Sequence, residues 1–230
     1  MRNPDQILDA YRNNRDITRD ECRQLYELVD DPWGLGSSIN HHSYLDVVAR
    51  LDKYIRWEEI DWIVDYGSGI GTFTRAVKDR HPHIKSLAVD FDTAHEAARR
   101  RFGADIFDHQ FGMNTEINEH DLINHTFPDL DIDRLCICFF NSINYVFKDL
   151  KKRKRPKALS RLVRHFEGLA RQPDTRYLIA SSNFFDSGAN QAMQRRDLEL
   201  IYLSRDLELD NEEPDFKAEL HTRVWQRRAT

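Results

Sequence analysis

The chain has 230 residues, of which 40% are hydrophobic, and a formal net charge of −5. This size and apolar content predict one globular domain with a substantial core and exclude a disordered chain. The acidic balance gives no general attraction to nucleic acid, and the apolar runs are too short to span a membrane. Three cysteines provide neither a disulfide framework nor a metal site, and no secretory signal is recognisable, so we expect a cytoplasmic protein without a bound metal.

The first part of the chain, residues 1–58, is predicted to be helical. Thr18 and Glu21 have the spacing of a capping box, and apolar residues then recur at helical intervals. A second apolar stripe, from Tyr44 to Ile55, predicts another helix. We expect this segment to form a lid within the same domain as the core at 59–230, with Trp33 near the covered ligand.

The most informative stretch is Val64–Thr74, with the sequence VDYGSGIGTFT. An apolar run ends in Asp65, three glycines follow at alternate positions, and an amphipathic segment begins at once. This order predicts a strand, a tight turn and a helix N-terminus, an arrangement that lets backbone N–H groups approach a nucleotide-like ligand. The spacing is G-x-G-x-G, whereas the dinucleotide fingerprint has its third glycine at the position of Thr72.

Two acidic residues indicate which ligand this loop would bind. Asp65 lies two residues before the first glycine, where it would repel a pyrophosphate and attract an ammonium group. Asp90 ends a second apolar run 19 residues after Gly71, a position suited to accept hydrogen bonds from ribose hydroxyls. Phe91 follows and would cover one face of an adenine. S-adenosylmethionine (SAM) carries an ammonium group and a ribose, and it has no phosphate.

Together, Asp65-x-Gly67-x-Gly69-x-Gly71 and Val89-Asp90 resemble the class I SAM-dependent methyltransferases. The match is specific from Ile60 to Asp92 and looser toward the C-terminus. The resemblance implies a Rossmann-like α/β fold with SAM as the cofactor. The residues expected at the cofactor are Trp33, Asp65, Gly67, Ser68, Gly69, Gly71, Asp90, Phe91 and Asn141.

From Ile60 onward, predicted strands and helices alternate, which favours a parallel sheet covered on both faces. The predicted strands are 61–65, 87–90, 104–109, 135–140 and 177–181, and the predicted helices are 72–80, 94–102 and 156–169. Alternating apolar residues within 198–209 and 216–225 predict an antiparallel pair at the sheet edge. With the resemblance, this gives a three-layer sandwich whose seven-stranded, mostly parallel sheet ends in that pair and is preceded by N-terminal helices.

Side chains that could do chemistry follow the predicted strands 135–140 and 177–181. Asn141 comes directly after the first of these strands, and Ser182 and Asn183 follow the second. Ligands of open α/β sheets lie beyond the carboxyl ends of strands, so each residue could touch cofactor or substrate or simply cap a loop. Asn141 is a candidate catalytic residue. His41 and His42, which precede a predicted helix, are candidate general bases or merely solvated side chains.

The stretch 148–171 is basic, with ten Lys or Arg residues against two acids. It is either a docking surface for RNA or an acidic partner, or a solvated helix face. The proline-containing motifs of base-modifying methyltransferases are absent after the strand 135–140. We therefore expect a methyltransferase for a small-molecule N or O acceptor. The alternatives are an RNA or protein methyltransferase, and a SAM-binding protein that transfers nothing. The oligomeric state stays open.

Overall fold

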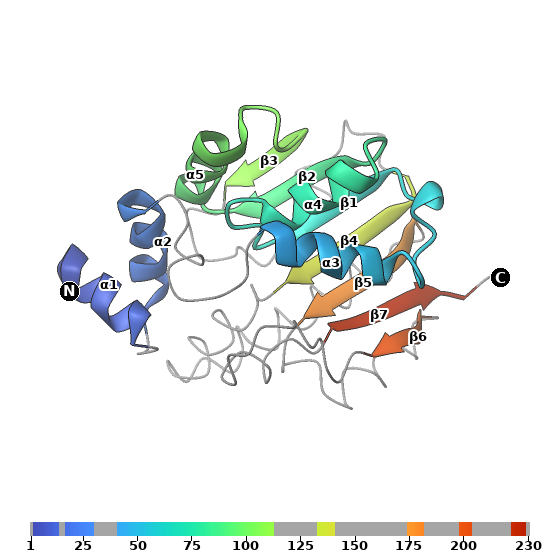
Figure 1. Ribbon diagram of the computed structural model, residues 1–230, viewed down its shortest axis with the longest axis horizontal. Helices are drawn as coiled ribbons and strands as arrows, with labels where there is room; N and C mark the ends of the chain where they lie inside the picture. The colour runs from blue at the N-terminus through green and yellow to red at the C-terminus, as the bar shows by residue number, and fades with distance from the viewer. Residues whose placement is uncertain are drawn as a thin grey trace.

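The computed structural model describes residues 2–13, 17–29, 41–112, 133–140, 174–181, 198–203 and 222–228. These residues form helices and strands that alternate from the middle of the chain onward (Figure 1). The elements are α1 (Pro4–Arg12), α2 (Arg19–Leu28), α3 (His41–Leu51), the 3-10 helix η2 (Trp57–Glu59), β1 (Trp62–Tyr66), α4 (Thr72–Arg80), β2 (Lys85–Asp90), α5 (Asp92–Phe102), β3 (His109–Gly112), β4 (Leu135–Phe140), β5 (Thr175–Ser181), β6 (Leu198–Leu203) and β7 (Thr222–Arg227).

The strands form one mixed sheet in the order β3-β2-β1-β4-β5-β7-β6. Strands β1 to β5 pair in parallel, whereas β7 is antiparallel to both β5 and β6. The predicted parallel sheet with an antiparallel pair at its edge is therefore confirmed. The last strand in the chain, β7, lies between β5 and β6, so it has a hydrogen-bonded neighbour on each side and β6 forms the edge of the sheet.

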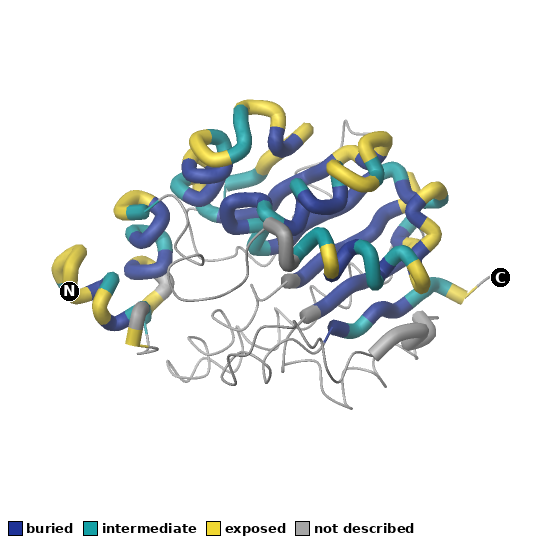
Figure 2. Tube along the Cα trace, viewed as in Figure 1, coloured by how far each residue is buried: buried dark blue, intermediate teal, exposed yellow. Residues whose placement is uncertain are grey.

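The core lies on both faces of this sheet. On one face, Ile63 and Cys138 pack with Val48 of α3 and Phe73 of α4 in one buried cluster. Residues that alternate with these, such as Val64 and Ile137, are equally buried, at 1% and 0% exposure. Figure 2 shows the central strands as almost continuously buried, with exposure concentrated on the outer turns of the helices. Near-continuous burial of this kind is typical of parallel strands covered on both faces.

The N-terminal helices are fixed by their caps and by α5. Thr18 and Glu21 form the predicted capping box of α2, with bonds of 3.2 and 2.8 Å. The α2 backbone then accepts side-chain hydrogen bonds from α5, from Thr93 and Arg100. Helix α2 packs on α5 and α1 packs on α2, and both lie at the end of the sheet toward which the arrowheads of β3, β4 and β5 point (Figure 1).

The predicted bounds of two elements, α3 and β3, differ from the structure in ways that have a physical cause. The helix expected to carry apolar residues as far as Ile55 ends at Leu51, and Tyr54 is exposed beyond it. The strand expected at 104–109 is a turn followed by β3 from His109 onward. The cause is Asp108, whose carboxylate accepts bonds from the Ser86 backbone and hydroxyl, so regular pairing with β2 starts only at His109.

Candidate functional site

The candidate site is the loop between β1 and α4. It follows a strand at the centre of the sheet, where the chain order reverses: β2 and β3 lie on one side of β1 and β4 on the other. In open α/β sheets this reversal opens a crevice beyond the carboxyl ends of the strands, and ligands bind there. The structure thus brings the glycine loop, the end of β1 and the end of β2 together.

Each glycine of the loop has a left-handed backbone, with φ of 70° at Gly67, 56° at Gly69 and 79° at Gly71. The requirement is sharpest at Gly71, which caps the N-terminus of α4. A Cβ atom there would lie 2.6 Å from the ring of Phe107 and 3.1 Å from Ile106. Only glycine satisfies both the backbone angle and this close packing.

Asp90 supports the loop from the end of β2. Its Oδ2 accepts a hydrogen bond from the Gly69 N–H at 2.6 Å, and its Oδ1 accepts one from the Phe91 N–H at 2.7 Å. The side chain is buried but for a few per cent. Each carboxylate oxygen has a second lone-pair direction, so the group can accept further bonds from ligand hydroxyls.

Asp65, the other acid, has different surroundings. It is 2% exposed, and its Oδ2 lies 2.7 Å from the hydroxyl of Thr74 in the first turn of α4. Burial raises the pKa of Asp65 to about 7; the Thr74 hydrogen bond lowers it and the nearby Asp90 charge raises it further. An ammonium group placed beside this carboxyl would stabilise its ionised form.

Two further residues of the predicted cofactor site, Ser68 and Phe91, are described by the structure. The Ser68 hydroxyl, inside the glycine loop, is buried and has no hydrogen-bond partner in the described part of the chain. A buried hydroxyl of this kind has an unused donor and acceptor that a ligand can satisfy. Phe91 is half-buried at the start of α5 and packs against the buried cluster that includes Ile70 and Tyr26. Loop and ring thus fit a ligand with polar groups at one end and an aromatic base at the other.

Several predicted residues lie outside the description. Trp33, Asn141, the residues 182–186 and the basic stretch 148–171 are not among the described residues. His41 and His42 begin α3, but their side chains are not described either. Tyr44, on the same helix, packs edge-to-face on Phe73 with ring centroids 5.8 Å apart, on the α4 side of the sheet.

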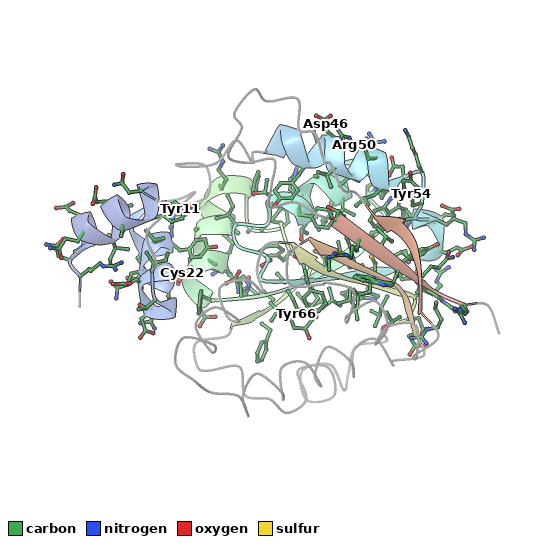
Figure 3. The ribbon with its side chains drawn as sticks, turned by 90° about the horizontal axis from the view of Figure 1, so that it is seen from below. Tyr11, Cys22, Asp46, Arg50, Tyr54 and Tyr66 are labelled. Carbon is green, nitrogen blue, oxygen red and sulfur yellow. The ribbon has the colours of Figure 1, made fainter. Side chains whose placement is uncertain are left out.

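The structure adds residues that sequence reasoning did not select. Thr74 is fully buried against Asp65, and the buried pair Ile106 and Phe107 lies beneath Gly71. Thr74 sits nine residues after Asp65 and carried no motif signal, whereas Ile106 and Phe107 were assigned to a strand. Tyr66 lies on the opposite side of the sheet from α3, which carries the labelled Asp46 and Arg50 (Figure 3). Its ring stacks on that of Phe139, with ring centroids 5.2 Å apart.

Other kinds of site find no support in the described ranges. Within them, no group of three or more His, Cys, Asp or Glu side chains could hold a metal ion. Of the helices described, none is long and apolar enough to cross a membrane.

Comparison with known proteins finds similarity to methyltransferases. No model of a known protein family matches the chain. A stretch of 76 residues is 33% identical to caffeic acid 3-O-methyltransferase of Zea mays, covering 30% of this chain and 20% of the relative. Among solved structures, a SAM-dependent methyltransferase of Leishmania major is similar with a TM-score of 0.57 and 10% identity, over 97% of this chain and 82% of the other.

An O-methyltransferase family protein of Burkholderia thailandensis is similar with a TM-score of 0.54 and 14% identity, over 92% of this chain and 61% of that one. The fold is that of the SAM-dependent methyltransferases. This chain spans about a fifth of the length of the curated relative that it matches.

Proposed function

We propose that this protein is a SAM-dependent methyltransferase that acts on a small-molecule oxygen or nitrogen acceptor. The observation that carries the proposal is the geometry of the glycine loop, with left-handed Gly67, Gly69 and Gly71 at the reversal of strand order and Asp90 bonded to the loop. The resemblance of this chain to the methyltransferases at the same residues supports SAM as the ligand.

Each end of the cofactor has a proposed partner. Asp65 and the loop backbone would hold the amino-acid end, with the Ser68 hydroxyl as a further bond. Asp90 would accept bonds from the ribose hydroxyls, and Phe91 would flank the adenine. SAM supplies a sulfonium-bound methyl group that is already reactive toward nucleophiles. The protein would therefore contribute mainly by holding donor and acceptor in line.

A hydroxyl acceptor is the first to test, because the curated relative and the Burkholderia structure are both named as O-methyltransferases. Such an acceptor must lose its proton, so a general base is required. His41 and His42 are the first candidates, since both stand at the start of α3. We also propose that α1, α2 and the segment containing Trp33 act as a lid, because α1 and α2 lie at the carboxyl end of the strands (Figure 1).

The test has two stages. Calorimetry with S-adenosylhomocysteine (SAH) measures cofactor binding, and transfer of labelled methyl from SAM to panels of phenols, aliphatic alcohols, amines, RNA and protein measures activity. Labelling of small molecules is expected. Labelling confined to RNA or protein would favour the alternative that uses 148–171, and SAH binding without transfer to any panel would favour a SAM-binding protein. Absence of SAH binding would contradict the whole proposal.

A further inference from the structure

Asp65 and Thr74 form a buried pair at the base of the glycine loop. Thr74 is the third residue of α4, it is fully buried, and its hydroxyl lies 2.7 Å from Oδ2 of Asp65. Solvent barely reaches this contact, because Asp65 itself is 2% exposed. Asp65, the acid that a cationic ligand group would meet, is thus hydrogen-bonded to a neutral donor, the Thr74 hydroxyl.

Asp65 and Asp90 have unequal sets of partners. Asp90 accepts two backbone N–H bonds, from Gly69 and Phe91, and such donors stabilise a charged carboxylate. The glycine N–H groups nearest Asp65 are directed elsewhere: Gly67 donates to the Val89 carbonyl and Gly71 to the Ser68 carbonyl. One hydroxyl is a weak counterpart for a buried negative charge, which costs free energy unless it is paired.

The charged and titratable groups on the adjoining elements do not supply a counter-charge. Asp90 on β2 is itself an acid. On β4, the residue paired with Asp65 is Cys138, whose thiol carries no positive charge. The cations of α4 have other partners. Arg75 pairs with Asp79 at 2.8 Å, and Lys78 pairs with Asp108 at 3.0 Å. Within the described residues, Asp65 therefore lacks a cation.

We propose that Asp65 is a neutral acid in the cofactor-free protein and that the ammonium group of the cofactor ionises it on binding. Thr74 is the positioning residue that stabilises the resulting carboxylate. The carboxyl O–H bond breaks and its proton passes to solvent. The carboxylate then pairs with the ammonium group and accepts the Thr74 hydrogen bond. This inference rests on the proposed function, since it needs a ligand with an ammonium group at Asp65.

Burial raises the pKa of Asp65 to about 7, while the Thr74 hydrogen bond acts in the opposite direction. Thr74 also lies in the first turn of α4, where the helix end favours negative charge. Removing the hydroxyl should therefore make ionisation harder and move the pH dependence of binding upward. A residue with only a packing role would lower stability without moving that pH dependence.

Proton release is the decisive measurement. SAH is titrated into the full chain at pH 6.0 in buffers of different ionisation enthalpy, and the slope of the observed heat gives the protons exchanged. The ligand amine is the α-amino group of an amino acid, and its pKa lies well above 6.0, so it is already an ammonium group at this pH. Release close to one proton per bound SAH is expected. As the pH increases toward 7, SAH affinity should also rise about tenfold per pH unit, because binding releases a proton.

Variants identify the group. Asp65→Asn should bind SAH more weakly and release no proton. Thr74→Val should move the midpoint of the affinity–pH curve upward, and Thr74→Ser should restore it. Binding by the wild type without proton release would overturn the inference while the proposed function stands. No SAH binding would overturn both. The wild-type measurement needs no variant, so it decides the matter even if a variant fails to fold.

Discussion

The Gly69 backbone N–H donates to the Asp90 carboxylate across 2.6 Å, and this bond joins the glycine loop to the neighbouring strand. The two residues are 21 positions apart, and they meet because β1 and β2 are parallel neighbours whose carboxyl ends coincide. One carboxylate therefore has two tasks: it shapes the loop, and in the proposed function it also binds the ribose.

Replacing Asp90 by Asn should weaken SAH binding by roughly 10- to 150-fold, because a charged acceptor of hydrogen bonds is lost. Calorimetry measures the effect. The matched control is Asp108→Asn, just before β3, where the carboxylate accepts bonds from Ser86 at the other end of β2 and from Lys78. The control should lower stability and leave SAH affinity intact. Equal affinity losses in the two variants would show that Asp90 acts only through the fold.

Gly71→Ala should destabilise the protein by roughly 2–3 kcal/mol, from the left-handed backbone and the contact with Phe107 together. Denaturant unfolding measures this change. Gly103→Ala is the control: its φ is also positive, at 102°, but its nearest contact is the side chain of Asp105 at 3.1 Å. Gly71→Ala should also reduce SAH affinity, whereas Gly103→Ala should not. An unchanged SAH affinity in Gly71→Ala would contradict the assignment of the loop.

His95 should make stability depend on pH. The residue is 1% exposed, neither ring nitrogen has a hydrogen-bond partner in the described part of the chain, and its ring lies edge-on to Phe107. Burial lowers the pKa of His95 to about 4; Asp92 raises it and Arg99 lowers it. The unfolded chain then binds more protons than the folded one between about pH 6.5 and pH 4, so stability falls as pH falls through this range.

The expected loss from His95 is roughly 3 kcal/mol across that interval. Urea unfolding from pH 7 to pH 4 measures it, and the difference between wild type and His95→Leu isolates it. Replacing the exposed His109 by Gln is the control for the loss of a histidine that is not buried. Asp65 contributes with the opposite sign in the cofactor-free protein, because its raised pKa gives stability that is lost as pH rises toward 7. A pH-independent difference for His95→Leu would refute the prediction.

The cysteines should be protected in the folded protein. Cys136 and Cys138 are fully buried on β4, with sulfur atoms 3.9 Å apart, and burial raises the pKa of the Cys138 thiol. Because the thiolate is the reactive form, an aromatic disulfide reagent should label these two only as fast as the protein unfolds. Cys22, which is 8% exposed, should react sooner. Cys22→Ser then leaves only slow labelling; a fast phase in that variant would contradict the burial of β4.

Local sequence determined the glycine loop, its two acids, the helix from Thr72 to Arg80 and the strand from Leu135 to Phe140. These depend on spacing, apolar periodicity and the backbone freedom of glycine, all of which are encoded within a few residues. The resemblance to methyltransferases rested on the same local features. It therefore indicated the donor and gave less information about the acceptor.

Tertiary structure alone decided how the two acids differ. Asp65 and Asp90 look alike in sequence, each at the end of an apolar run, yet Asp90 receives two N–H bonds and Asp65 a single hydroxyl. Tertiary contacts of Asp108 also make β3 begin only at His109. Packing likewise places β7 between β5 and β6. Each of these depends on contacts between segments distant in the chain, and the charge state of a carboxyl is set by such contacts and not by its neighbours in sequence.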